Sequence, residues 1–152
     1  MKKTLEQQLQ ILVNDAPKHG IAPIVIQKAI APELLAIANQ LAQTHYCLLQ
    51  SPQQDWLISV ISQVDFPKIE KKVIFAFSSL ELATQKQPQA IALELPVIEI
   101  LWRFFSLQQI DSLIFVEGSQ PSSSSIEIDR QQLQHRLQQQ LMRLKDTPFD
   151  IA

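Results

Sequence analysis

The sequence that decides the fold reads KKVIFAF (71–77), SSLELATQKQ (78–87), AIALEL (90–95), PVIEILWRFFSLQQ (96–109) and DSLIFVEG (111–118). The first, third and fifth segments have the apolar pattern of buried β-strands, and the second and fourth have helical composition. Two short helical crossovers in series predict three neighbouring parallel strands with right-handed connections.

The boundaries of these elements carry recognisable end signals. Ser78 and Glu81 have the spacing of a capping box, with Ser78 at the N-cap, and Pro88 ends that helix. Pro96 stands where the first turn of the next helix tolerates a missing N–H. These signals predict helices that start after Ser78 and at Pro96.

Upstream, the chain predicts a helical N-terminal part. Thr4 opens a helix with Gln7 at N3, a second capping box. A further helical pattern covers 23–43, and Pro32 interrupts it, so that either one kinked helix or two helices fit the sequence.

Two β-rich runs, 45–50 and 56–62, follow this helical part. The five residues 51–55 separate them, a length typical of a hairpin loop, so the sequence predicts that the runs pair antiparallel. After Gly118 a Ser-rich segment reads as a loop. Ile126 and Ile128 fit a short edge strand.

The whole pattern predicts one α+β domain over residues 1–152. It comprises a helical part (1–43), a sheet core (45–117), a Ser-rich loop (118–125) and an amphipathic C-terminal helix (129–145). We expect a mixed sheet of about five strands, built from the hairpin and a βαβαβ unit.

Composition excludes several function classes. A net charge of -2 and a pI near 5.9 give no electrostatic basis for binding nucleic acid or an anionic membrane. The chain has only two glycines, which excludes glycine-rich phosphate loops and dinucleotide fingerprints, so no cofactor is expected. Cys47 is the single cysteine, and neither a signal peptide nor a membrane span is visible. We expect a cytoplasmic protein.

No catalytic or metal-ligating constellation stands out. His19, His45 and His135 lack partners at metal-ligand spacing, and the serines lack a Gly-x-Ser-x-Gly context. The sequence therefore favours a non-catalytic protein with no metal site.

Residues 46–118 resemble the N-terminal domain of bacterial SseB-type proteins. The features that match are the hairpin around Asp55-Trp56 and the segments VIFAFSSLELA, AIALELP and LIFVEG. Where that family closes its last strand with Asn-Pro-Gly, this chain has Val116-Glu117-Gly118. With 22 glutamines, the whole chain is also similar to an uncharacterised family of short, Gln-rich cyanobacterial proteins. Both resemblances imply an α+β fold, and neither implies a catalytic residue or a cofactor.

Two function hypotheses follow. The helix 96–108 is apolar over most of its circumference, so it needs cover beyond one sheet face, either from the chain's own helices or from a second subunit. The second alternative predicts a self-associating interaction or regulatory module, acting with its own copy or with another protein. Its candidate interface residues are Trp102, Phe105, Leu137 and Leu141.

The other hypothesis is a small-molecule or anion-binding protein, possibly an enzyme. Ligands favour the carboxyl ends of parallel strands, where a helix N-terminus adds free N–H groups. The candidate crevice residues are Ser78, Ser79, Glu117 and Ser119.

Overall fold

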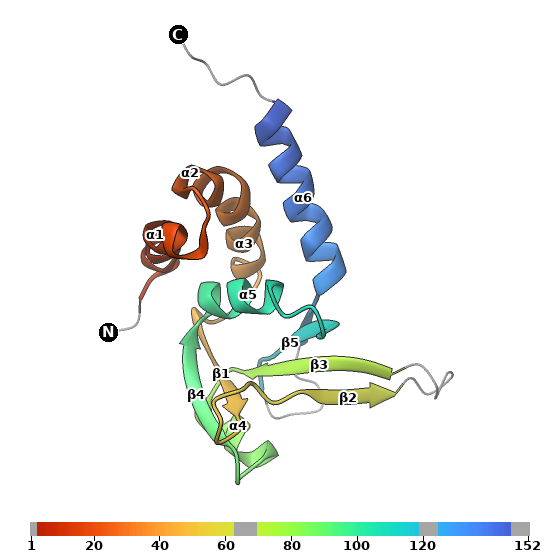
Figure 1. Ribbon diagram of the computed structural model, residues 1–152. Helices are drawn as coiled ribbons and strands as arrows, with labels where there is room; N and C mark the ends of the chain where they lie inside the picture. The colour runs from red at the N-terminus through yellow and green to blue at the C-terminus, as the bar shows by residue number, and fades with distance from the viewer. Residues whose placement is uncertain (1–2, 63–69, 119–124, 147–152) are drawn as a thin grey trace.

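The computed structural model describes residues 3–62, 70–118 and 125–146, and it has the α+β architecture that the sequence predicts (Figure 1). Its six strands form one mixed sheet. The strands are β1 (His45–Gln50), β2 (Ser59–Ser62), β3 (Glu70–Phe77), β4 (Ile91–Pro96), β5 (Ser112–Val116) and β6 (Ser125–Asp129).

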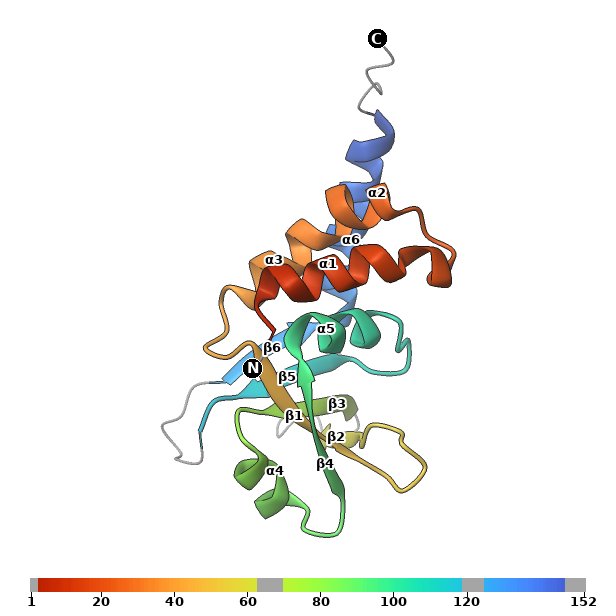
Figure 2. The same cartoon turned by 90° about the vertical axis from the view of Figure 1, so that its left-hand side faces the viewer.

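Helices precede, connect and follow these strands. They are α1 (Leu5–Asp15), the 3-10 turn η1 (Ala16–His19), α2 (Pro23–Val25), the π-helical turn η2 (Ile26–Ile30), α3 (Ala31–Ala38), α4 (Leu80–Lys86), α5 (Val97–Phe105) and α6 (Arg130–Asp146). In both views α6 extends beyond the N-terminal helices (Figures 1 and 2).

The strand order is β4-β1-β3-β5-β6, which corrects one prediction. β3 and β5 are parallel neighbours, as the crossover pattern predicts. However, β4 does not lie beside β3, because β1 pairs antiparallel with both and separates them. Sequence pattern identifies a strand without specifying its neighbours, so the sequence does not show that β1 lies between β3 and β4.

The predicted hairpin is also wrong over most of its length. Gln50 and Trp56 form a single antiparallel bridge, and the pairing stops there. β2 then leaves β1 and pairs with the N-terminal half of β3, while β1 pairs with its C-terminal end. β1 and β2 therefore lie end to end along one edge of β3, with β5 along the other edge.

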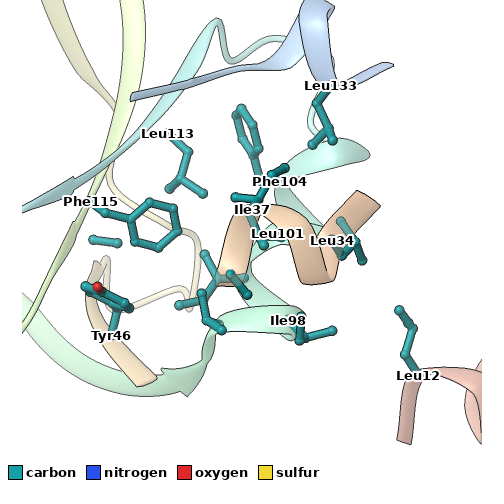
Figure 3. Packing of buried hydrophobic residues seen from close by; sticks show 14 of the residues in the cluster. Leu12, Leu34, Ile37, Tyr46, Ile98, Leu101, Phe104, Leu113, Phe115 and Leu133 are labelled. Atoms are coloured by element: carbon teal, nitrogen blue, oxygen red, sulfur yellow. The ribbon is translucent and has the colours of Figure 1, made fainter. Parts of the chain in front are cut away.

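One face of the sheet is covered by α5 and by the helices outside it (Figures 1 and 2). α1, α3 and α6 all contact α5, so the chain's own helices cover this helix. Figure 3 shows the resulting core, in which side chains from the sheet meet side chains from these helices. Its fully buried members include Leu34, Tyr46, Ile98, Leu101, Phe104, Leu113 and Phe115.

Among the described helices, α4 alone lies on the opposite face, where it contacts β1, β3 and β4. A smaller apolar cluster lies there, around Cys47, Leu49, Phe77 and Ala83. Beside α4 the face is hollowed, with a cavity volume of about 380 Å³.

Local signals explain the helix boundaries. Thr4 and Gln7 exchange the two hydrogen bonds of the predicted capping box. Pro23 to Ala38 form one uninterrupted helical segment, which answers the question left open by the sequence. Pro32 is the second residue of α3, in the turn that follows the π-helical turn η2, where its missing N–H is accommodated.

Candidate functional site

The predicted crevice at the carboxyl ends of the parallel strands is used by the chain itself. The Ser78 N–H donates to the Val116 carbonyl at 2.9 Å, which links β3 and β5 just past their ends. Ser79, and not Ser78 as predicted, is the N-cap of α4, and its hydroxyl accepts a hydrogen bond from the Leu82 N–H at 3.2 Å. Ser119 lies outside the described residues.

Glu117 also has a partner within the chain. Its carboxylate accepts a hydrogen bond from the hydroxyl of Tyr46, a fully buried side chain that also packs edge-on against Phe115. Burial, followed by the hydrogen bond to Glu117, raises the pKa of the Tyr46 hydroxyl far above its ordinary value. Tyr46 and Glu117 therefore join β1 to the end of β5.

The four predicted interface residues differ in their placement. Trp102 and Phe105 are half-buried and stack on each other, with ring centroids 6.3 Å apart, and Trp102 also meets His19 edge-on. Leu137 is only 1% exposed because the chain's own core buries it. Leu141 is half-buried. Only the two aromatic residues and Leu141 thus present side-chain surface to the outside.

The sheet offers a clearer unpartnered surface at the outer edge of β4. Among the described strands, β4 pairs with β1 alone, and it lies at the margin of the sheet (Figures 1 and 2). Its Ile91 and Leu93 side chains are 51% and 38% exposed. An apolar edge strand with unpaired backbone groups is a template for adding another strand.

The hydrogen-bonding direction along β4 follows from one contact. The Val97 N–H donates to the Thr44 carbonyl at 3.0 Å, in the same register that pairs β4 with β1. Backbone groups of an antiparallel strand alternate in direction, so Leu95 and Leu93 also face β1. The N–H and carbonyl groups of Ala92 and Glu94 consequently face outward, away from the sheet.

The sequence indicated β4 but not its exposure. The one available signal is the absence of lysine or proline between Ile91 and Leu95, since protected edges usually carry such residues. β6, the strand at the other end of the sheet, has the acidic residues Glu127 and Asp129.

Comparisons of the chain with protein-family models, with curated proteins and with solved structures found no match. The resemblances described above stay predictions. In the described part of the chain, no helix is long and apolar enough to cross a membrane.

Proposed function

We propose that the protein is a non-catalytic interaction module that self-associates by pairing the outer edge of β4 with that of a second copy. The observation that carries the proposal is the unpaired edge of β4 together with the exposed side chains of Ile91 and Leu93. Two antiparallel copies of one strand are self-complementary, as a two-fold dimer requires.

Charge disfavours one register of this pairing. With Glu94 on the two-fold axis, two carboxylates would lie directly opposite each other, which is unfavourable. With Leu93 on the axis, Ala92 lies opposite the partner's Glu94, and their outward backbone groups form hydrogen-bonded pairs. Ile91 then meets the partner's Leu95, so apolar side chains face each other along the junction. We therefore place Leu93 opposite its own copy.

Light scattering coupled to size-exclusion chromatography tests the proposal. We expect the native protein to be a dimer at concentrations from about 10 to 500 μM, the range in which a micromolar dissociation constant is visible. Leu93→Lys and Leu93→Glu should each be monomeric, because like charges would meet at the axis. An equimolar mixture of the two variants should again form a dimer, since residue 93 of one copy faces residue 93 of the other.

The matched control is Val60→Lys. Val60 is an apolar residue of β2 with 55% exposure, and its replacement should leave the dimer intact. A native protein that is monomeric throughout the concentration range would refute self-association. A dimer that survives Leu93→Lys would refute the β4 edge as its site.

The hollow beside α4 supports a second candidate function, the binding of a small apolar carboxylate. Its walls are mostly apolar and include Leu57, Phe75 and Val116, and Lys86 is the one charged residue among the described lining residues. The volume of about 380 Å³ is within the range of small-molecule sites. Titration with octanoate, followed by amide chemical shifts, should perturb these residues in the native protein and bind more weakly to Lys86→Gln. No perturbation at saturating octanoate would refute this candidate.

A further inference from the structure

A second cavity, of about 650 Å³, lies on the helix-covered face of the sheet, beyond the C-terminal end of α5. Its apolar lining includes Ile58, Leu107 and Ile110, and its charged lining residues are Asp55 and Arg103. The other lining residues are Trp56, Ile74 and the uncharged polar residues Gln54, Ser106, Gln108 and Gln109. None of these residues belongs to β4, so this cavity is separate from the proposed dimer edge.

The Arg103 side chain is held over the ring of Trp56. Its guanidinium carbon lies 4.4 Å from the ring centroid, the geometry of a cation–π contact. Arg103 forms no ion pair with a carboxylate among the described residues. The contact therefore fixes a guanidinium at the cavity while its hydrogen-bond donors stay available.

Trp56 contributes a second donor that lacks a partner. The residue is only 8% exposed, and its indole N–H has no hydrogen-bond acceptor in the described part of the chain. Leaving a buried donor without a partner carries a free-energy cost. An acceptor that enters the cavity and reaches this group would recover part of that cost.

Asp55 supplies charge of the opposite sign. Its backbone is fixed, because its carbonyl accepts from the Ser51 N–H at 2.9 Å. Its carboxylate forms no ion pair with Arg103 or with any other described residue. One cavity thus holds an anion and a cation that form no ion pair with each other, together with walls of apolar and uncharged polar residues.

We infer that this cavity binds a zwitterion with an apolar side chain, that is, an apolar α-amino acid or a short apolar peptide. The ligand carboxylate binds Arg103, with the Trp56 N–H as a further donor, and the ligand ammonium binds Asp55. The apolar side chain packs on Leu107 and Ile110. The volume lies within the usual range of small-molecule sites and also accommodates a dipeptide.

The test follows the indole N–H signals by nuclear magnetic resonance during titration with leucine and with the dipeptide Leu-Leu. The chain has two tryptophans, so two indole signals are expected, and Trp56→Phe identifies that of Trp56. At about 10 mM ligand, enough to saturate a site with a dissociation constant of about 1 mM, the Trp56 signal should shift more than that of Trp102. The ligand that binds more tightly shows whether the cavity prefers a free amino acid or a peptide.

Two ligand analogues and two variants test the roles of the two charged residues separately. N-acetylleucine lacks the ammonium and leucinamide lacks the carboxylate. Asp55→Asn should weaken the binding of leucine about tenfold or more and leave the binding of N-acetylleucine unchanged. Arg103→Gln should weaken the binding of leucine to a similar extent and leave the binding of leucinamide unchanged. Lys28→Gln, which removes an exposed cation elsewhere, is the matched control and should bind leucine like the native protein.

Circular dichroism melting of each variant checks that the fold is retained. The absence of any Trp56 shift with all four ligands would overturn the inference. Leucine binding that is unaffected by Asp55→Asn would also overturn it, because the cavity would then recognise a carboxylate and not a zwitterion.

Discussion

The side-chain oxygen of Gln8 accepts a hydrogen bond from the backbone N–H of Ile98 at 3.0 Å, which connects α1 to the first turn of α5. The Gln8 amide nitrogen donates to the carbonyls of Thr44 and Lys3, at 3.0 and 3.1 Å. Pro96, the N-cap of α5, has no side-chain acceptor for the N–H groups of that first turn. A side chain from a distant helix therefore satisfies one of them.

Replacing Gln8 should destabilise the fold. In Gln8→Leu the Ile98 N–H loses its partner in a buried place, while the Thr44 carbonyl keeps its hydrogen bond from the Val97 N–H. The loss should lower the free energy of unfolding by about 1–3 kcal/mol. Urea denaturation measures this change. Gln10→Leu, in the same helix but exposed, is the control and should change it by less than about 0.5 kcal/mol. Equal effects of the two replacements would contradict this role of Gln8.

Replacing Gln54 with glycine should stabilise the fold. It has a φ of 70°, the only positive φ of a non-glycine residue in the described part of the chain. A left-handed conformation strains a residue with a Cβ by about 1–2 kcal/mol, and glycine avoids this strain. Gln54→Gly should raise the free energy of unfolding by about 0.5–1 kcal/mol, whereas Gln53→Gly should lower it through backbone entropy. A loss of stability in Gln54→Gly, measured by thermal and urea denaturation, would contradict the assignment of strain.

Glu127 should make the stability of the fold depend on pH in the acidic range. Its carboxylate accepts from the Lys71 ammonium and, at 2.6 Å, from the Ser112 hydroxyl, and these bonds lower the pKa of Glu127 below its ordinary value of 4.5. A lowered pKa in the folded state stabilises the fold above pH 4.5, and this contribution is lost as the pH falls below that value. Glu127→Gln should therefore be less stable than the native protein at pH 7, and the difference should shrink as the pH falls below 4.5.

Denaturation of both proteins at several pH values between 7 and 3 measures this dependence. Glu70→Gln, at an exposed position at the start of β3, is the control. A stability difference for Glu127→Gln that stays constant across this range would show that the carboxylate is not stabilised as described.

Most element types could be predicted from the sequence because their signals are local. The capping box of Thr4 is confirmed. The C-terminal helix begins where the sequence predicts, and the Asp129 carboxylate there accepts a hydrogen bond from the Gln132 N–H at 3.0 Å. The cap of α4 was misplaced by one residue, because Ser78 and Ser79 are both good N-cap residues and only the backbone distinguishes them.

The candidate surfaces could be predicted far less well, because they depend on long-range contacts. Asp55 and Arg103 are widely separated in sequence, and nothing local indicates that they line one cavity. Gln8 did carry a signal, since it falls on the apolar stripe of Leu5 and Leu12, where a glutamine needs a buried partner.

The insertion of β1 between β3 and β4 has a consequence for dissecting the chain. Residues 70–118 look self-contained in sequence, yet without β1 the strands β3 and β4 have no shared neighbour and cannot form a continuous sheet. We expect a peptide of these residues to show little β-structure by circular dichroism and no cooperative melting. A fragment that also includes β1 and β2 restores the missing central strand, and we expect it to regain both properties. The smallest part of this protein that folds on its own thus begins before residues 71–118, the segment whose sequence most clearly predicts the fold.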